Sequence, residues 1–380
     1  MTQHWSVHQN YLELGNMPFY WRMSQSPDPI NGIKQSLPAR ISINLEFDFL
    51  ELMMSDDEWK NLEKAYGQNE NIGFINPESG QLDTYGKSVN QFFLNVANSV
   101  QPKKIYEIGC GAGFTINFMK KHGWNVVGID PSDYSKKWSE ILGFELLSTY
   151  FDDLTLDAEA ELIICNDVFE HVRNVLEFSS HVYHALKPGG VFCFSTTNST
   201  LSVQIGDISM LEHQHVNMFT EHSISLILRN AGFNQIEIKK GDYGNTFHVV
   251  ARKVSIQHSN IAKRHFLCTD FFERASHKLE AFSRFYHKYG SQCAFYVPLR
   301  CIPYLASVGD FGNRPIFDSN VKWTGKYIDG YKRPISGPDD IDSNPSSHFF
   351  VGSMTFEKQI TEMLISQNIS PTNIHRIRDL

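Results

Sequence analysis

The stretch KIYEIGCGAGF, residues 104–114, decides the fold together with NVVGIDPSD, residues 125–133. In the first stretch an apolar run leads into glycines at alternate positions and then into a segment of helix length. Glycine lets the backbone turn sharply and approach a ligand closely, and the helix that follows presents free N–H groups at its positive end. Asp130 ends the second apolar run, where a carboxylate can accept hydrogen bonds from both hydroxyls of a ribose. The pattern predicts a strand, a ligand-binding turn and a helix.

Short apolar runs alternate with helix-length stretches around this turn, which is the alternation that builds a parallel sheet covered by helices. The predicted strands are 104–108, 125–129, 144–149, 161–166, 191–196, 235–239 and 246–252. The last two are separated only by the turn GDYGN, so we expect them to pair antiparallel. Apolar residues at helical spacing predict helices in VLEFSSHVYHA, residues 175–185, and SISLILRNAGF, residues 223–233. We therefore predict an α/β domain with a seven-stranded, Rossmann-like sheet over residues 86–253.

Composition and charge limit the function classes. A chain of 380 residues with 41% hydrophobic and 20% charged residues is typical of a folded protein of two or three domains. A net charge of −8 opposes binding to nucleic acid, which depends on clustered cations. The start MTQHWSVHQNYLELGN lacks the apolar stretch of a secretory signal, and no later segment is apolar enough to span a membrane, so we expect a soluble, cytoplasmic protein. Six cysteines without a CxxC pair predict neither disulfides nor a zinc site.

The remaining segments suggest three further parts. Residues 1–85 are rich in aromatic and polar residues and are interpreted as a cap or lid, with a helix near Asp56 to Tyr66. Residues 254–290 are interpreted as a helical connector. After it the runs CAFYV, RPIFD and HFFVG predict strands, and FEKQITEMLISQN predicts a helix. We expect a second, smaller Rossmann-like domain over residues 291–380.

The glycine spacing favours one nucleoside cofactor over another. The third glycine of EIGCGAGF comes one residue earlier than in the GxGxxG fingerprint of dinucleotide-binding domains. An acidic residue, Glu107, precedes the loop, the fourth strand runs into NDVFEHV (166–172), and LKPGG (186–190) precedes the fifth strand. In these four motifs the chain resembles the class I S-adenosylmethionine-dependent methyltransferases over about residues 85–253. A Rossmann domain that binds NAD or no nucleotide stays as the alternative.

The resemblance implies which residues bind S-adenosylmethionine. Gly109 and Gly111 lie against its methionine part and Asp130 binds the ribose. Asn166 lies near the amino group, and Asp152 or Asp153 approaches the adenine. Glu170 and His171 orient the cofactor and the neighbouring loop. The full set of expected cofactor residues is Tyr85, Glu107, Gly109, Cys110, Gly111, Gly113, Asp130, Asp152, Asp153, Asn166 and His171.

Candidate catalytic residues lie in the long segment after the fifth strand. This segment passes over the carboxyl end of the sheet, where ligands bind in such folds. Its part HQHVNMFT (213–220) resembles HEHLSYFS of the sugar C-methyltransferases, which implies His215 as general base with His213 in support. Gln214 and Met218 replace the Glu and Tyr of that family. Two alternatives stay open: both histidines only brace the loop, or Glu212, His213 and His215 bind a metal. Since no further ligand is visible, we predict no metal site.

The C-terminal region extends this resemblance. FDSNVKWTGKYIDGYKRPISGPDDI (317–341) and HFFVGSMTFEKQITEMLISQNI (348–369) resemble the C-terminal domain of the same family, which is itself Rossmann-like. The family's N-terminal zinc cysteines are absent, and the turn PLRC after CAFYV has no glycine that would admit a phosphate.

The sequence therefore predicts a methyltransferase for a small polar acceptor, a sugar or nucleotide-sugar of surface-glycan or natural-product biosynthesis. The alternatives are O- or N-methylation of a non-sugar metabolite, and a non-catalytic scaffold that binds S-adenosylmethionine. We expect no nucleic-acid or membrane partner and leave a homodimer open.

Overall fold

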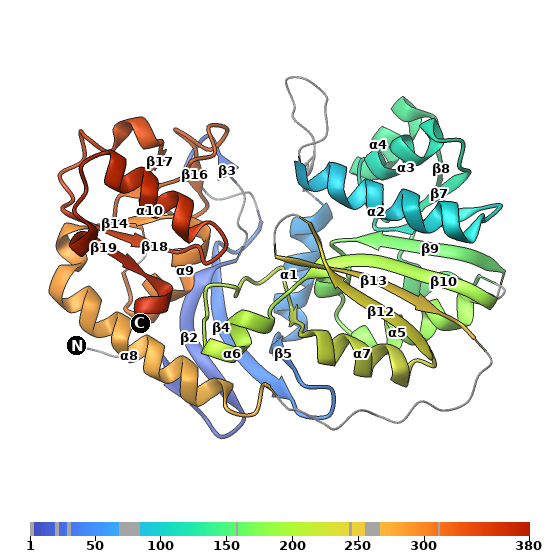
Figure 1. Cartoon of the computed structure of the whole chain (residues 1–380), viewed down its shortest axis with the longest axis horizontal. Helices are drawn as coiled ribbons and strands as arrows, with labels where there is room; N and C mark the ends of the chain where they lie inside the picture. The colour runs from blue at the N-terminus through green and yellow to red at the C-terminus, as the bar shows by residue number, and fades with distance from the viewer. Residues whose placement is uncertain are drawn as a thin grey trace.

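The protein is seen in a computed structural model that describes residues 4–19, 23–28, 32–67, 84–156, 159–242, 245–254, 267–310 and 312–380. Within these residues the strands form a seven-stranded sheet, two five-stranded sheets and a two-stranded pair. The seven-stranded sheet lies on one side of the molecule and the C-terminal sheet on the other, with the long N-terminal strands between them (Figure 1).

The seven-stranded sheet has the strand order β12-β13-β10-β9-β6-β7-β8. Its strands are β6 (Ile105–Ile108), β7 (Val126–Ile129), β8 (Glu145–Leu147), β9 (Ala160–Asn166), β10 (Leu186–Thr197), β12 (Gln235–Lys240) and β13 (Thr246–Arg252). Only β13 runs antiparallel to its neighbours, β10 and β12, and all other pairs are parallel. All seven predicted strands are present, and the predicted antiparallel pairing of the last two is confirmed, although residues 243–244 of their turn lie outside the described residues.

Helices cover both faces of this sheet, as the alternating sequence predicts (Figure 1). Apolar residues of α2 and α3 form one core with one face, and those of α5 and α7 form another core with the opposite face. Val175, Phe178 and Val182 are the buried residues of α5 that the helical spacing predicted. The helices of this part are α2 (Thr84–Val100), α3 (Phe114–Lys121), α4 (Asp133–Leu142), α5 (Val175–Ala185), α6 (Thr200–Ile205) and α7 (Glu221–Asn230).

The N-terminal residues form a second sheet, of order β1-β2-β4-β5-β11. Its strands are β1 (Ser6–Val7), β2 (Tyr11–Pro18), β4 (Ser36–Asn44), β5 (Phe49–Leu52) and β11 (Asn217–Met218). The predicted helix is present as α1 (Asp56–Gly67), but the sequence analysis did not identify the strands. Strand β11 belongs to the segment after β10 and pairs antiparallel with β5, so the loop that carries His215 is attached to the N-terminal sheet.

The C-terminal sheet is entirely parallel, of order β17-β15-β14-β18-β19. Its elements are β14 (Cys293–Tyr296), α9 (Pro298–Ser307), β15 (Ile316–Phe317), β17 (Ile335–Ser336), β18 (His348–Val351), α10 (Glu357–Ser366) and β19 (Ile374–Arg376). The strands and the helix expected here are all present. The predicted fold class, an α/β chain with a seven-stranded Rossmann-like sheet and a smaller Rossmann-like C-terminal sheet, is confirmed.

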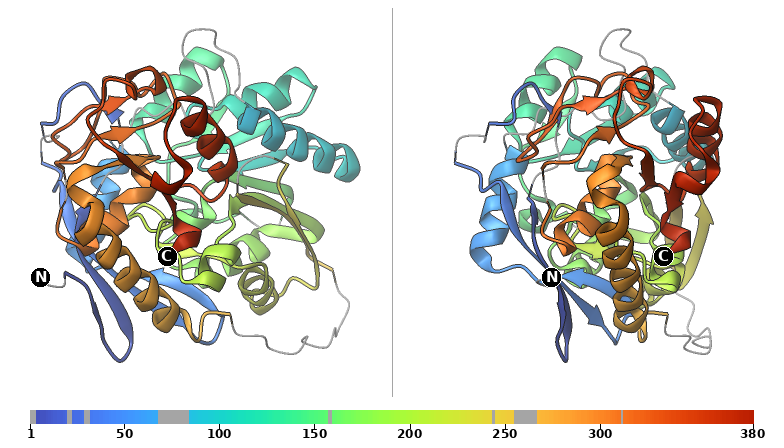
Figure 2. Two further views of the ribbon diagram at one scale, coloured as in Figure 1. Left: turned by 60° about the vertical axis from the view of Figure 1, so that its left-hand side comes forward. Right: turned by 90° about the vertical axis from the view of Figure 1, so that its left-hand side faces the viewer.

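The packing crosses the segment boundaries placed from the sequence. Helix α8 (Phe271–Tyr289) buries Phe271, Ala275, Leu279 and Phe282 in a core shared with β2, β4, β14 and α9. Figure 2 shows α8 lying along the N-terminal strands. A further pairing, of β3 (Met23–Ser24) with β16 (Tyr327–Ile328), joins the same two regions. Residues 255–266 of the predicted connector lie outside the described residues. In the described part of the chain, no helix is both long and apolar enough to cross a bilayer.

Candidate active site

The three glycines of the loop after β6 adopt positive φ angles, 68° at Gly109, 49° at Gly111 and 70° at Gly113. A Cβ atom on Gly109 would lie 2.5 Å from Val168, and one on Gly113 would lie 2.2 Å from Phe144, so close packing excludes a side chain at both positions. A Cβ on Gly111 would meet no heavy atom within 4 Å. Gly111 therefore borders open space, as a residue beside a ligand must.

Asp130 lies at the end of β7, next to this open space. One carboxylate oxygen accepts a hydrogen bond from the Gly111 N–H at 3.0 Å. The other accepts from the Ser132 N–H at 2.9 Å and from the Ser132 hydroxyl at 2.6 Å. These bonds hold the carboxylate beside the glycine turn, and its contact with a ribose diol stays a prediction.

Glu107 and Cys110 flank the loop from inside the core. Glu107 is buried, its Oε2 atom has no hydrogen-bond partner among the described residues, and burial raises the pKa of its carboxyl group to about 8. A cationic ligand group nearby would satisfy this oxygen. Cys110 is also buried, and burial raises the pKa of its thiol well above the usual value. Its side chain is therefore a core group, and only its backbone can contact a ligand.

Tyr85 and Asn166 meet at Asp167, a residue that the sequence analysis did not single out. The Tyr85 hydroxyl donates to the Asp167 carboxylate at 2.7 Å, and the Asn166 amide donates to its other oxygen at 3.4 Å. Asp167 has a φ angle of 50°, unusual for a residue with a side chain, and burial raises the pKa of its carboxyl to about 7. Its place directly after the fourth predicted strand was the signal for it, because ligands bind at the carboxyl ends of such strands.

Asp152 and Asp153 lie on an exposed helical turn, Phe151–Asp153. The Asp152 carboxylate lies 3.3 Å from Nδ1 of His181. The structure shows no contact of either carboxylate with the glycine loop, so their approach to an adenine stays a prediction.

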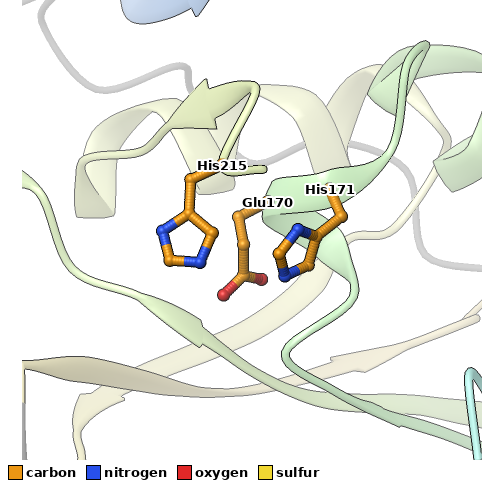
Figure 3. A group of neighbouring side chains, drawn as sticks. All are labelled: Glu170, His171 and His215. Atoms are coloured by element: carbon orange, nitrogen blue, oxygen red, sulfur yellow. The ribbon is translucent and has the colours of Figure 1, made fainter. Parts of the chain in front are cut away.

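Glu170, His171 and His215 come together at the carboxyl ends of β9 and β10, with Glu170 between the two rings (Figure 3). Nδ1 of His215 lies 2.7 Å from the carboxylate of Glu212. Burial acts to lower the pKa of His215, but the carboxylates of Glu212 and Glu170 raise it above the usual value. Burial acts to raise the pKa of Glu212, whereas His215 holds it at about 2. The Glu212 carboxylate therefore orients the His215 ring through Nδ1 and stabilises its protonated form, as a carboxylate beside a general base does.

His213 lies apart from this cluster. Its side chain is buried, with Nδ1 3.0 Å from the carbonyl oxygen of Pro18 and Nε2 3.2 Å from that of Pro38. Burial lowers the pKa of its ring. Both ring nitrogens face backbone carbonyls of the N-terminal sheet, which is the arrangement that the bracing alternative predicts, and the supporting catalytic role of His213 stays a prediction.

A cavity of about 90 Å³ lies between the seven-stranded sheet and the C-terminal sheet, and His215 forms part of its wall. It is bounded by the segment after β10, the start of α9 and the residues that follow β18. The side chains around it are mostly hydroxyls and amides, and Arg300 contributes a cation. The lining residues are Thr197, Asn198, Ser199, Ser202, Asp207, Ser209, Met210, His215, Met218, Asn245, Arg300, Gly352, Ser353, Met354 and Thr355.

Arg300 and Tyr66 are further site residues that the sequence analysis missed. Arg300 reaches the cavity from α9, in the C-terminal sheet region, and the Tyr66 hydroxyl at the end of α1 lies 2.9 Å from Nδ1 of His171. Arg300 lies in the turn PLRC, which the sequence analysis considered only for its lack of glycine, and Tyr66 belongs to no motif, so no local signal assigned either residue to the site.

Comparison with known proteins agrees with the geometry of the glycine loop. Residues 82–238 match the model of a family described as a methyltransferase domain. The ubiquinone biosynthesis O-methyltransferase of Actinobacillus pleuropneumoniae serotype 7 is 35% identical over 117 residues, which are 28% of this chain and 50% of that protein. That of Rickettsia prowazekii is 27% identical over 170 residues, 42% of this chain and 68% of that protein. The chain spans about half the length of most of these curated relatives.

Solved structures with partial similarity include a SAM-dependent methyltransferase from Archaeoglobus fulgidus, 15% identical with a TM-score of 0.38, covering 44% of this chain and 94% of that chain. Human N-acetylserotonin methyltransferase in complex with SAM is 20% identical with a TM-score of 0.38, and the match covers 45% of this chain and 52% of that chain. None of these four relatives is named as a sugar C-methyltransferase, so that finer resemblance is not confirmed. Residues 82–238 therefore match a methyltransferase domain, and S-adenosylmethionine is its cofactor.

Proposed function

We propose that the whole chain is a cytoplasmic enzyme that transfers the methyl group of S-adenosylmethionine to a sugar or nucleotide-sugar. The observation that carries this proposal is the polar cavity enclosed between two Rossmann-like sheets, with the His215 imidazole on its wall. The carboxyl ends of the strands are where α/β sheets bind ligands, and here two such edges contribute to one cavity.

The residues of the glycine loop fit the cofactor. S-adenosylmethionine, when bound, supplies a methyl group on a positively charged sulfur. Asp130 binds the ribose hydroxyls, and Gly111 leaves room for the ligand beside the backbone. Burial raises the pKa of both the Glu107 and the Asp167 carboxyl groups, and the positive charge of a ligand bound beside them would favour their ionised, hydrogen-bond-accepting form.

The polar residues around the cavity match the hydroxyl groups of a polyhydroxylated acceptor, but at about 90 Å³ the cavity has to widen to hold a whole sugar, since small-molecule sites usually measure roughly 300 to 1,000 Å³. Asn198, Ser202 and Asn245 offer hydrogen bonds to hydroxyl groups, and Arg300 offers a cation to a phosphate or carboxylate. Holding the acceptor in line with the methyl carbon can lower the barrier by roughly 7 to 11 kcal/mol, so these positioning residues dominate the rate.

His215 is the proposed general base. The Glu212 carboxylate accepts a hydrogen bond from the Nδ1–H group, and in the neutral ring Nε2 is then available to take the acceptor's proton. A base in this position contributes about 100- to 10,000-fold to the rate.

O-methylation of a non-sugar metabolite is the second candidate, because the curated relatives are named as O-methyltransferases of ubiquinone biosynthesis. An apolar acceptor needs apolar walls, and in this cavity Met210, Met218 and Met354 are the large apolar side chains. The polar lining therefore favours a sugar over an apolar acceptor.

The test is turnover of the full chain with S-adenosylmethionine and a panel of sugars, nucleotide-sugars and phenols, followed by mass spectrometry for the gain of one methylene. His215→Ala should lower turnover about 100-fold or more at unchanged cofactor affinity, while the exposed His184→Ala should have no effect. Methylation of phenols alone would support the second candidate. Cofactor binding without any turnover would support a non-catalytic scaffold, and the absence of cofactor binding in isothermal titration would refute the proposal.

A further inference from the structure

We infer that Glu170, His171 and His215 form a binding site for a divalent transition-metal ion of the zinc type. One ligand atom from each residue lies within 4.8 Å of the other two. Metal–ligand bonds to these groups are about 2.0 to 2.2 Å long, so small side-chain rotations suffice to bring all three atoms onto one ion. Figure 3 shows the carboxylate between the two imidazole rings.

The hydrogen bonds around the two histidines prepare both rings for metal binding. Nδ1 of His171 lies 2.7 Å from the carbonyl oxygen of Gln214, and Nδ1 of His215 lies 2.7 Å from the carboxylate of Glu212. Each ring donates its Nδ1 proton to an oxygen, which leaves the Nε2 lone pair for a ligand. Histidines that bind metals almost always have such an outer oxygen partner, and a carboxylate or a backbone carbonyl is the usual one.

Glu170 supplies an independent indication of a ligand. It is 0% exposed, and one carboxylate oxygen accepts a hydrogen bond from the Thr196 hydroxyl at 2.8 Å. The other oxygen, Oε1, is buried without a hydrogen-bond partner among the described residues. A buried carboxylate oxygen without a partner is unfavourable, because it has lost its hydration and gained no hydrogen bond, and a cation between the rings removes this penalty.

The ligand set selects the type of ion. Two imidazoles and one carboxylate suit Zn²⁺ and similar transition metals, whereas Mg²⁺ prefers oxygen ligands alone. Three protein ligands leave coordination positions open, as in catalytic zinc sites. Because His215 also lines the cavity, an oxygen atom of a molecule bound there can occupy an open position.

The metal site would take part in the proposed methyl transfer. This chemical role rests on the proposed function. With the ion bound, His215 acts as a metal ligand instead of a free base. The ion then lowers the pKa of an acceptor hydroxyl, whose proton passes to water. Binding of the ion itself depends only on the three ligands.

The experiment measures metal binding directly. The full, tag-free chain is stripped with a chelator and titrated calorimetrically with ZnCl₂ and with MgCl₂, and Co²⁺ is added to record its visible absorption. We expect one Zn²⁺ site per chain, much weaker Mg²⁺ binding and a Co²⁺ spectrum typical of mixed nitrogen and oxygen ligands. Glu170→Gln should abolish the site, and Glu212→Gln should weaken it about 10- to 100-fold because it changes only the outer partner of His215.

His277→Ala is the matched control, because His277 is exposed on α8 and should leave Zn²⁺ affinity unchanged. Titration with S-adenosylmethionine in every variant verifies the fold and tests the cofactor site separately. The inference is overturned if Zn²⁺ fails to bind to a chain that still binds the cofactor, or if Glu170→Gln binds Zn²⁺ as tightly as the unaltered protein. Turnover that persists in the chelator-treated protein would overturn the chemical role of the ion.

Discussion

Single residues of the glycine loop have different tasks although their backbone angles are alike. Gly109 and Gly113 are required by the packing of Val168 and Phe144, whereas Gly111 faces open space. The same positive φ angle therefore serves packing at two positions and ligand access at the third.

Gly111→Ala tests this distinction at the scale of one methyl group. The substitution should cost about 1 to 2 kcal/mol of folding free energy, because alanine is strained at a φ of 49°. It should also lower the affinity for S-adenosylmethionine at least tenfold in isothermal titration, since the methyl group fills ligand space. Gly143→Ala is the control, as Gly143 has a φ of 63° with no atom within 4 Å of the added Cβ and lies at the end of α4. Equal cofactor affinity in the two variants would contradict this assignment.

At the scale of elements, the segment after β10 is held by the N-terminal sheet. Strand β11 extends that sheet through its pairing with β5, and His213 lies between the carbonyls of Pro18 in β2 and Pro38 in β4. The neighbouring His215 is thereby fixed at the cavity wall. The N-terminal residues thus position a candidate catalytic side chain through the backbone of this segment.

His213→Ala should destabilise this attachment. Loss of the ring removes the hydrogen bond that its N–H donates to one of these carbonyl oxygens and leaves a buried cavity, and it should lower the free energy of unfolding by about 1 to 3 kcal/mol in urea denaturation. Cofactor affinity should stay nearly unchanged, because the hydrogen bonds of the His213 ring lead to the N-terminal sheet and away from the glycine loop. His122→Ala, an exposed substitution at the end of α3, is the comparison for stability. A variant as stable as the unaltered protein would rule out the bracing role.

At the scale of the whole molecule, one core joins both ends of the chain. It combines apolar residues of β2 and β4 with those of α8, β14 and α9. Phe282 lies within it, with ring centroids 5.1 Å from Tyr304 and 5.2 Å from Phe350. The cavity beside His215 is consequently formed by regions that fold against a common core.

Phe282→Ala should therefore destabilise regions far from α8 in the sequence. Removing this fully buried ring should lower the free energy of unfolding by about 3 to 5 kcal/mol. Hydrogen exchange should show faster opening of β2 and β4 as well as of β14. Ile365 is 43% exposed, so Ile365→Ala should leave the free energy of unfolding and the hydrogen-exchange rates nearly unchanged. Unaltered exchange in β2 and β4 would show that the N-terminal sheet does not depend on this core.

The sequence by itself determined the parallel sheet, the glycine turn and the carboxylate of Asp130. Each of these follows from local rules: apolar runs of strand length, glycines where φ must be positive, and an acidic residue at the end of the next strand. The same rules predicted three of the five strands of the C-terminal sheet, β14, β15 and β18, but not β17 and β19. They did not reveal β2 and β4, and the N-terminal interpretation went no further than a cap or lid.

Only the tertiary structure decided which polar side chains face one another. His213 and His215 are two positions apart, yet one is bound to the N-terminal sheet and the other lies beside Glu170 and His171. Arg300 reaches the cavity from a different sheet, and Tyr66 reaches His171 from α1. These contacts depend on the long-range packing of separate elements. The residues next to each of these side chains in the sequence carry no signal of such packing.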